Sequence, residues 1–398
     1  MTMWPTCEVE ACAGVKAKGF DRCLGHLSGD QLEQFLDALQ PKADLDARGT
    51  TVTASLLAQL IPALGEFGHL DFTKAQFEDV EEVELLGDRL TLDRAKFARW
   101  VHIGGRADYV SCVGTQFVGG VRLQVSYAAV DASEATFGDT SMIATSHRYA
   151  PWPRGGKWDR EWEERFAGTG VRLFSLRGCD VRNLVLVNVD LSWCLFAGAH
   201  RLDQLRLEGR CRFNTERAHW WWTRRQKLAE EYLSFTQQQH PHLGVPVAAG
   251  PARVAGLYRS LRKAFEDSKN EAGAGDFYYG EMEMRRQSPA TPLSERWILT
   301  AYWLLSGYGQ RAARALAALV VVIATVSVLL FTVGLPGEPV WAGPRVEQSA
   351  RIALGAVVLR DAGQQLTSAG SWTVMVARVV GPVLLALAVL AVRARVKR

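Results

Sequence analysis

The chain has 398 residues, of which 48% are apolar and 22% are charged, and this length predicts two or three folded units. A net charge of +4 is too small for a protein dedicated to nucleic acid, so we expect no nucleic-acid partner. The seven cysteines are too few and too scattered for a secreted disulfide framework, and the amino terminus lacks the features of a signal peptide. We therefore expect residues 1–309 to lie in a reducing cytoplasm.

Residues 1–28 contain a group of soft metal ligands, which are Cys7, Cys12, Cys23 and His26. Zn²⁺ binds four such ligands tetrahedrally, and four protein ligands leave no position for a reacting water. The spacing is not that of a common zinc finger, and the alternative is three unrelated thiols. We predict a structural Zn²⁺ site that folds a segment too short to have its own core.

Residues 29–69 are expected to form a helical cap. Ser28 is suited to begin a helix, with Gln31 completing a capping box, and an apolar stripe follows at Leu32, Phe35, Leu36 and Leu39. A second helix is expected after Thr53 and should break near Pro62. Such helices would cover the edge of the repeat region that follows.

A repeat of 20 residues dominates the segment 70–213, apart from an insertion at 146–169. Three apolar columns recur at this period: Leu70, Leu90, Val110 and Val130; Phe77, Phe97, Phe117 and Phe137; Val83, Ile103, Leu123 and Ile143. Within each block, units of a small residue followed by an apolar one fall about five residues apart, which a helical heptad does not sustain. The pattern predicts coils with four short sides that stack at about 4.8 Å and share one core.

Three of these units, Ala75-Gln-Phe77, Ala95-Lys-Phe97 and Ala135-Thr-Phe137, resemble the pentapeptide-repeat family. The resemblance implies a right-handed quadrilateral β-helix. Glu82, Gly87 and Arg122 depart from it, since they stand where the family prefers Leu or Phe.

Two further segments are similar to membrane-bound bacterial members of that family. They are the Cys-Leu-Gly-His-Leu run at 23–27 and the Asp-Phe-Tyr-Tyr-Gly-Glu-Met-Glu run at 276–283. This similarity implies a zinc-like motif at the amino terminus, and it implies little about mechanism. Some family members imitate DNA through an acidic face, but the charges of the present repeats nearly balance, so we do not expect that role.

The insertion 146–169 carries Trp152, Trp158 and Trp162, and it is interpreted either as a cover for the β-helix or as a contact surface. Beyond it, Cys179 and Cys194 resume the five-residue spacing. We interpret these two cysteines as small core residues and not as redox or metal sites.

Residues 214–309 are expected to form a helical stalk, with helices at 226–235 and 253–270 and a break at Gly273–Gly275. Trp220–Trp222 fits either a membrane interface or a cap on the last coil. The acids Glu266, Asp267, Glu281 and Glu283 alternate with basic residues, which favours solvated ion pairs over a catalytic site. Residues 306–309, Ser-Gly-Tyr-Gly, are interpreted as a helix break at the membrane surface.

Residues 310–398 predict a hairpin of two transmembrane helices. Residues 315–335 are uncharged and long enough for a bilayer core of about 30 Å. A second span, 372–392, contains Arg378, which we interpret as snorkelling or pairing with a helix, or else as an ion or partner contact. Between the spans, the apolar stretch 352–359 predicts a re-entrant or an interfacial helix.

Basic residues flank the outer ends of both spans, so the positive-inside rule places both termini in the cytoplasm of a multi-pass protein of the cell membrane. The sequence thus predicts a mixed multidomain protein in which a β-helix with helical caps precedes the membrane hairpin. We expect a non-enzymatic scaffold that presents the β-helix to an unknown protein partner. The alternative is an oligomeric two-span pore, assembled through its transmembrane helices and gated by the repeat domain.

Overall fold

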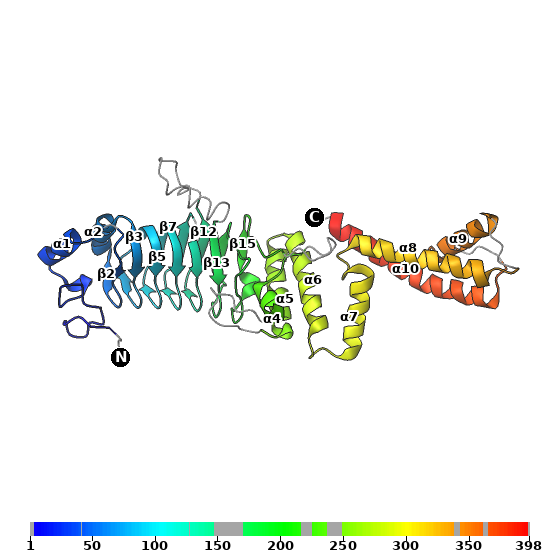
Figure 1. Cartoon of the computed structure of the whole chain (residues 1–398), viewed down its shortest axis with the longest axis horizontal. Coiled ribbons are helices and arrows are strands. Elements are labelled where there is room, and N and C mark those ends of the chain that lie inside the picture. Colours follow the sequence, from blue (N-terminus) through cyan, green and yellow to red (C-terminus); the bar gives the residue numbers. More distant parts are fainter. Residues whose placement is uncertain are drawn as a thin grey trace. The chain divides into compact units, whose positions relative to one another are not determined.

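The computed structural model describes residues 4–40, 42–126, 128–146, 170–215, 225–236, 249–337, 343–360 and 365–396. The chain divides into two compact units, Met1–Phe277 and Tyr278–Arg398. Figure 1 shows the helices and strands of each unit, which are described in turn.

The first unit begins with short helices. The 3-10 helix η1 (Leu24–His26) precedes α1 (Gly29–Asp37), whose Ser28–Gln31 capping box is present as predicted. Helix α2 (Ala54–Leu64) begins at the cap residue Thr53. Pro62 lies in the last turn of α2, which ends two residues later at Leu64, near the predicted break.

A parallel β-solenoid of about six turns follows. Its larger sheet contains ten strands: β1 (Leu45–Asp46), β3 (Phe67–Asp71), β5 (Glu82–Thr91), β7 (Val101–Ser111), β9 (Val121–Val125), β10 (Ala128–Asp131), β12 (Ser141–Thr145), β13 (Val171–Ser175), β14 (Leu184–Val187) and β15 (Arg206–Glu208). The smaller sheet contains five: β2 (Thr51–Thr53), β4 (Gln76–Glu78), β6 (Lys96–Phe97), β8 (Gln116–Phe117) and β11 (Thr136–Phe137). The strands stack one behind another along the solenoid (Figure 1).

The strand register confirms the three predicted apolar columns. Leu70 pairs with Leu90, and Val83 pairs with Ile103, each exactly one repeat further along the chain. The phenylalanine column is stacked inside the coils, with ring centroids 4.1, 5.2 and 6.0 Å apart from Phe77 to Phe137. Stacking of identical positions therefore builds the core, as the period implied.

Two details of the repeat differ from expectation. Glu82 and Arg122 are exposed, although the family resemblance placed them at inward positions. Glu82 lies on β5 and Arg122 on β9, where burial alternates along the strand and turns their neighbours Val83 and Leu123 inward. Strands β1 and β2 also pair with β3 and β4, so a turn precedes Leu70 within the segment expected to be a helical cap.

Strands on the two sides of the insertion pair directly with one another. β10 pairs with β13 and β12 with β14, so the solenoid continues across the insertion. Residues 147–169, with their three tryptophans, lie outside the described residues, as do Trp220–Trp222. Cys179 and Cys194 are fully buried in the core, as predicted.

Three helices end the first unit: α4 (Ala229–Thr236), α5 (Pro251–Asp267) and the beginning of α6 (Glu271–Gln287). The expected break at Gly273–Gly275 is wrong, because the chain turns earlier, at Lys269, where φ is 56°. Gly273 lies inside α6, at a position where a Cβ would come 2.6 Å from the Phe265 ring. The glycine permits close packing of α6 against α5.

The second unit contains the end of α6 and the helices α7 (Leu293–Ser306), α8 (Ala312–Leu329), α9 (Gly343–Val357) and α10 (Ser368–Val396). α8 continues as a π-helical segment to Gly334. Two helices, Ala312–Gly334 and Ser368–Val392, are long and apolar enough to span a membrane, with mean hydropathies of 2.8 and 2.4. α9 contains most of the apolar stretch between them and packs Ile352 and Ala353 into a core shared with Val326 and Val374 of the two spans.

Candidate metal centre

Cys7, Cys12, Cys23 and His26 converge as the sequence predicted. Their ligand atoms all lie within 4.8 Å of one another. The Cys12 and Cys23 sulfurs are 3.7 Å apart, and the His26 Nδ1 atom lies 3.6 Å from the Cys7 sulfur and 3.4 Å from the Cys23 sulfur. These thiols are free and not disulfide-bonded.

Three of the donor–donor separations have the lengths expected of a tetrahedral zinc site. Zn–S bonds of about 2.3 Å and Zn–N bonds of about 2.0 Å, arranged tetrahedrally, imply sulfur–sulfur edges of about 3.7 Å and sulfur–nitrogen edges of about 3.5 Å. The observed distances of 3.7, 3.6 and 3.4 Å agree with these values. The remaining separations are at most 4.8 Å, so the four donors lie close enough together to share one metal ion of this size.

Local folding brings the four residues together. An antiparallel bridge joins Thr6 to Val15, and the backbone N–H of Cys7 donates to the carbonyl of Gly14. This hairpin places Cys7 and Cys12 near Cys23, which begins η1, and the helical turn brings His26 back toward it. The backbone N–H of Gly14 also donates to the Cys12 sulfur, at 3.4 Å, a contact that favours the thiolate.

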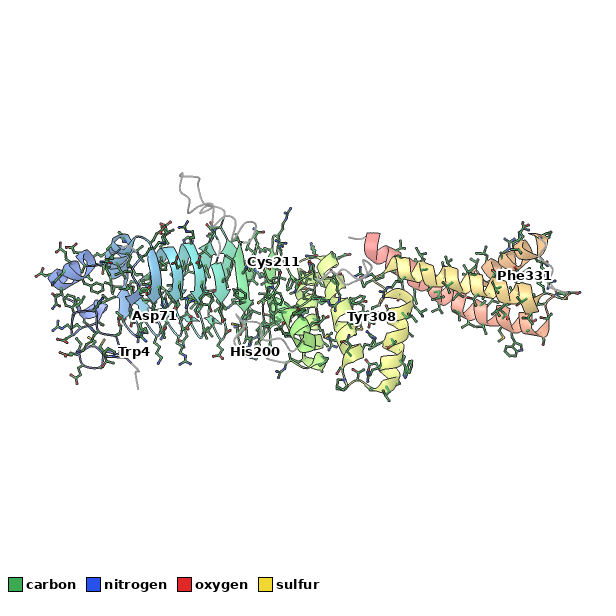
Figure 2. The ribbon with its side chains drawn as sticks, viewed as in Figure 1. Trp4, Asp71, His200, Cys211, Tyr308 and Phe331 are labelled. Atoms are coloured by element: carbon green, nitrogen blue, oxygen red, sulfur yellow. The ribbon has the colours of Figure 1, made fainter. Side chains whose placement is uncertain are left out.

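The segment 4–28, which carries the four candidate ligands, packs on the first solenoid turn. A Cβ at Gly14 would lie 2.8 Å from the Cβ of Cys23, and one at Gly25 would lie 2.6 Å from the Thr51 carbonyl oxygen. Val15 donates a backbone hydrogen bond to Arg48. On the same segment, the Trp4 indole, labelled in Figure 2, donates to the carbonyl of Ala13 and lies under the Arg48 guanidinium.

The electrostatics of the cluster would favour a bound cation. Burial alone raises the pKa of Cys7, but hydrogen bonds from the backbone of Val9 and Cys23 and from the His26 ring lower it to about 7. Burial and the neighbouring Cys12 and Cys7 sulfurs raise the pKa of Cys23 to about 12. The first thiolate thus forms readily and opposes the others, whereas a divalent metal would stabilise all three.

Chemically, such a set of ligands is closed. Three thiolates and one imidazole fill a tetrahedral shell, so a zinc ion held here has no position for substrate or for an activated water. The arrangement can stabilise the fold of the segment, and it offers no open position for catalysis.

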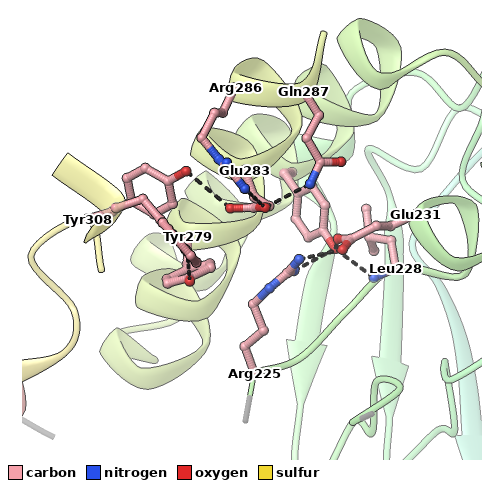
Figure 3. A network of polar contacts seen from close by, with 10 residues as sticks. Arg225, Leu228, Glu231, Tyr279, Glu283, Arg286, Gln287 and Tyr308 are labelled. Atoms are coloured by element: carbon pink, nitrogen blue, oxygen red, sulfur yellow. Dashed lines mark hydrogen bonds and ion pairs between the residues drawn. The ribbon is translucent and has the colours of Figure 1, made fainter. Parts of the chain in front are cut away.

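The sequence did not reveal a second group of buried ionisable residues, at the carboxyl end of the solenoid. Glu230 accepts hydrogen bonds from the backbone N–H groups of Phe196 and Ala197, which belong to the solenoid. Arg225 pairs with Glu231, and the Tyr258 hydroxyl donates to the same carboxylate (Figure 3). Arg225 and Glu230 lie close together in the chain, but their partners Phe196 and Tyr258 lie more than 30 residues away, so no local motif marks the group.

The acids of α6 in the second unit are not simply solvated. Glu283 accepts hydrogen bonds from Gln287 and Arg286, and also from the Tyr308 hydroxyl at 3.1 Å (Figure 3). Glu281 is buried. Ion pairing was predicted correctly for Glu283, but helix packing shields these carboxylates from water.

One corner of the solenoid exposes apolar and charged side chains on successive turns. Trp100 and Val118 are about half exposed, and Arg99 forms an exposed ion pair with Asp79. The backbone of Gly119 lies against the backbone of Trp100, since a Cβ at Gly119 would come 2.4 Å from the Trp100 backbone nitrogen. This corner, comprising Arg99, Trp100, Val118 and the exposed Arg122, is called the Trp100 corner below.

Comparisons with protein families, with curated proteins and with solved structures find no match for this chain. Function is therefore argued from the geometry above.

Proposed function

We propose that this chain is a non-enzymatic, membrane-tethered scaffold of the pentapeptide-repeat type. Its repeat region would be a right-handed quadrilateral β-helix that lies in the cytoplasm, and its two candidate spans would anchor it in the cell membrane. The observation that carries the proposal is the Trp100 corner, where a rigid β-solenoid holds an exposed tryptophan beside Val118 and Arg99. Tryptophan and arginine are the side chains most enriched at protein–protein hot spots.

The amino-terminal cluster supports the same function. In the proposal, Cys7, Cys12, Cys23 and His26 hold a structural Zn²⁺ ion, whose bonding fixes the segment against the first turn of the solenoid. When bound, the ion supplies only cross-linking, because its four ligands come from the protein. The chain's own contribution is the hairpin and the close packing at Gly14 and Gly25.

Site-specific photo-cross-linking in native membranes tests the scaffold proposal. A photoreactive amino acid replacing Trp100 should yield a discrete adduct, which Arg99→Glu and Arg122→Glu should weaken. The same probe at Lys18, which is exposed on the segment 4–28, should not yield that adduct. A folded protein that gives no adduct from either Trp100 or Val118 would rule out this corner as the partner surface.

A two-span pore is the second candidate function. It is favoured by the packing of α9 against both candidate spans, since a helix between two spans can line a pathway when copies assemble. Conductance of the purified protein in a planar bilayer, with Arg378→Ala as comparison, tests it. Current that changes with Arg378 supports a pore, and a silent bilayer containing inserted protein contradicts it.

A further inference from the structure

Helix α7 has one face that is already occupied. Leu299 is buried with Tyr279, Met282 and Tyr308, and Trp303 packs against the same cluster. The Trp303 indole N–H donates to the Tyr279 hydroxyl at 2.9 Å. This face therefore fixes α7 against the end of α6.

The opposite face of α7 is apolar and open. Leu293, Trp297, Ile298 and Leu304 are 71%, 75%, 69% and 66% exposed, respectively. Their spacing places them on one side of a helix. Several large apolar side chains exposed on one face indicate that a partner or a membrane covers this face in the functional protein.

The position of α7 in the chain indicates what covers this face. α7 ends at Ser306, where Gly307 adopts a left-handed conformation, and the candidate span begins at Ala312. Only five residues separate the two, so the carboxyl end of α7 lies within about 18 Å of the start of the span. A bilayer that holds α8 is therefore within reach of α7.

The side chains also differ between α7 and the span. The most exposed residues of α8 are aliphatic, such as Val320, Val321 and Val328, whereas the open face of α7 carries Trp297. Aliphatic side chains suit the hydrocarbon core, and tryptophan prefers the headgroup boundary. The exposed side chains of α8 thus suit the hydrocarbon core of a membrane, and those of α7 suit its headgroup boundary.

Charge around α7 fits the same surface. The guanidinium groups of Arg286 and Arg314 lie 4.9 and 5.2 Å from the Trp303 ring, and Arg296 and Arg311 lie nearby in the chain. Residues 278–314 contain five arginines and three glutamates, and two of these glutamates form ion pairs, Glu295 with Arg285 and Glu283 with Arg286. The remaining positive charge is complementary to anionic lipid headgroups.

From these observations we propose that α7 is an interfacial helix, which buries Leu293, Trp297, Ile298 and Leu304 at the boundary between headgroups and acyl chains of an anionic membrane. The inference rests on the proposed membrane tether. It adds a second lipid contact, one that lies along the surface and holds the end of α6 there through Leu299 and Trp303.

Fluorescence quenching in vesicles tests the inference on the full-length protein. A fluorescent amino acid is introduced at Ile298, and in separate variants at Val321 of α8 and at Glu84 of the solenoid. Each variant is reconstituted into phosphatidylcholine–phosphatidylglycerol vesicles that carry a doxyl quencher either near the headgroup or deep in the acyl chain. We expect Ile298 to lose most fluorescence with the shallow quencher, Val321 with the deep one, and Glu84 with neither.

The outcomes separate the interfacial helix from the tether. Quenching at Val321 without quenching at Ile298 overturns the interfacial helix and leaves the tether intact. Cross-linking of Ile298 to a second copy of the chain, in place of quenching, has the same meaning. Absence of quenching at Val321 overturns the tether itself. A probe at Leu304, on the same face of α7, gives an independent measurement if the Ile298 variant does not fold.

Discussion

At the scale of single residues, the sequence predicted a site only where its residues form a local pattern. Cys7, Cys12, Cys23 and His26 lie within one short segment and have a recognisable chemistry, so their convergence could be predicted. Glu230 and Arg225 could not be found in this way. Their partners, Phe196 and Tyr258, are set by the packing of helices on the solenoid, which leaves no spacing to detect.

The metal site gives the first prediction. Cys12→Ser should abolish binding of one zinc ion per chain, because a serine hydroxyl does not replace a thiolate in a soft tetrahedral site. Hydrogen exchange of residues 4–28 should accelerate in the same variant. Elemental analysis measures the metal, and Cys211→Ser, outside the cluster, should retain it. Full zinc content in Cys12→Ser would contradict the site.

Glu230 gives a prediction about pH. Its burial, opposed by hydrogen bonds from the backbone, raises its pKa to about 7. Below the ordinary glutamate pKa of about 4.5 both the folded and the unfolded states are protonated, and as pH rises toward 7 only the unfolded state gains from ionisation. The stability that Glu230 contributes is therefore present in acid and lost through this window, by about 3 kcal/mol.

A neutral side chain of similar shape should remove this dependence. Glu230→Gln keeps an acceptor for Phe196 and Ala197 and cannot ionise, so its free energy of unfolding should change less between about pH 5 and pH 8. Chemical denaturation of the detergent-solubilised protein measures the effect. Glu84→Gln changes an exposed carboxylate and should behave as the parent protein does. An unaltered pH profile in Glu230→Gln would argue against this role.

At the scale of elements, periodicity predicted the solenoid and misplaced several boundaries. The columns were visible because each turn repeats the same inward positions, which is a property of the sequence itself. Local propensity placed the end of one helix near Pro62, and α2 ends two residues later. It also predicted a break at Gly273–Gly275, but Gly273 lies inside α6, where its missing side chain makes room for the Phe265 ring.

The phenylalanine stack should be a principal source of solenoid stability. Phe97 is buried between Phe77 and Phe117, and truncating such a side chain costs about 3–5 kcal/mol through lost contacts and a residual cavity. Phe97→Ala should lower the unfolding midpoint strongly, as followed by circular dichroism. Val118→Ala, at a half-exposed position one turn away, should change stability by less than about 0.5 kcal/mol. Equal effects of the two substitutions would show that the stack is unimportant.

At the scale of the whole molecule, hydropathy predicted two candidate spans, and the helices in the structure begin three and four residues before the predicted starts. Orientation rests on flanking arginines and lysines, which the fold alone does not test. The sequence also did not predict that α9 would pack between the spans, because its apolar stretch is too short to reveal its partners.

Topology can be measured with fused reporters. An enzyme that is active only outside the cytoplasm should work when inserted in the segment 336–342 and should be inactive when fused after Arg398, because positive flanks retain both termini inside. A reporter that is active only in the cytoplasm should show the reverse pattern and serves as the control. Activity of the first reporter at the carboxyl terminus would contradict the assignment.

Each strand of the solenoid pairs with the strand one repeat later, and this pairing continues across the insertion. The register therefore repeats every 20 residues. Removing or duplicating the 20 residues between equivalent positions, such as Leu90 and Val110, would leave every inward side chain inward and change the length by about 4.8 Å. Removing an odd number of residues would turn the following strand inside out. The domain is in this sense a molecular ruler, whose length can change in whole coils while its cross-section stays the same.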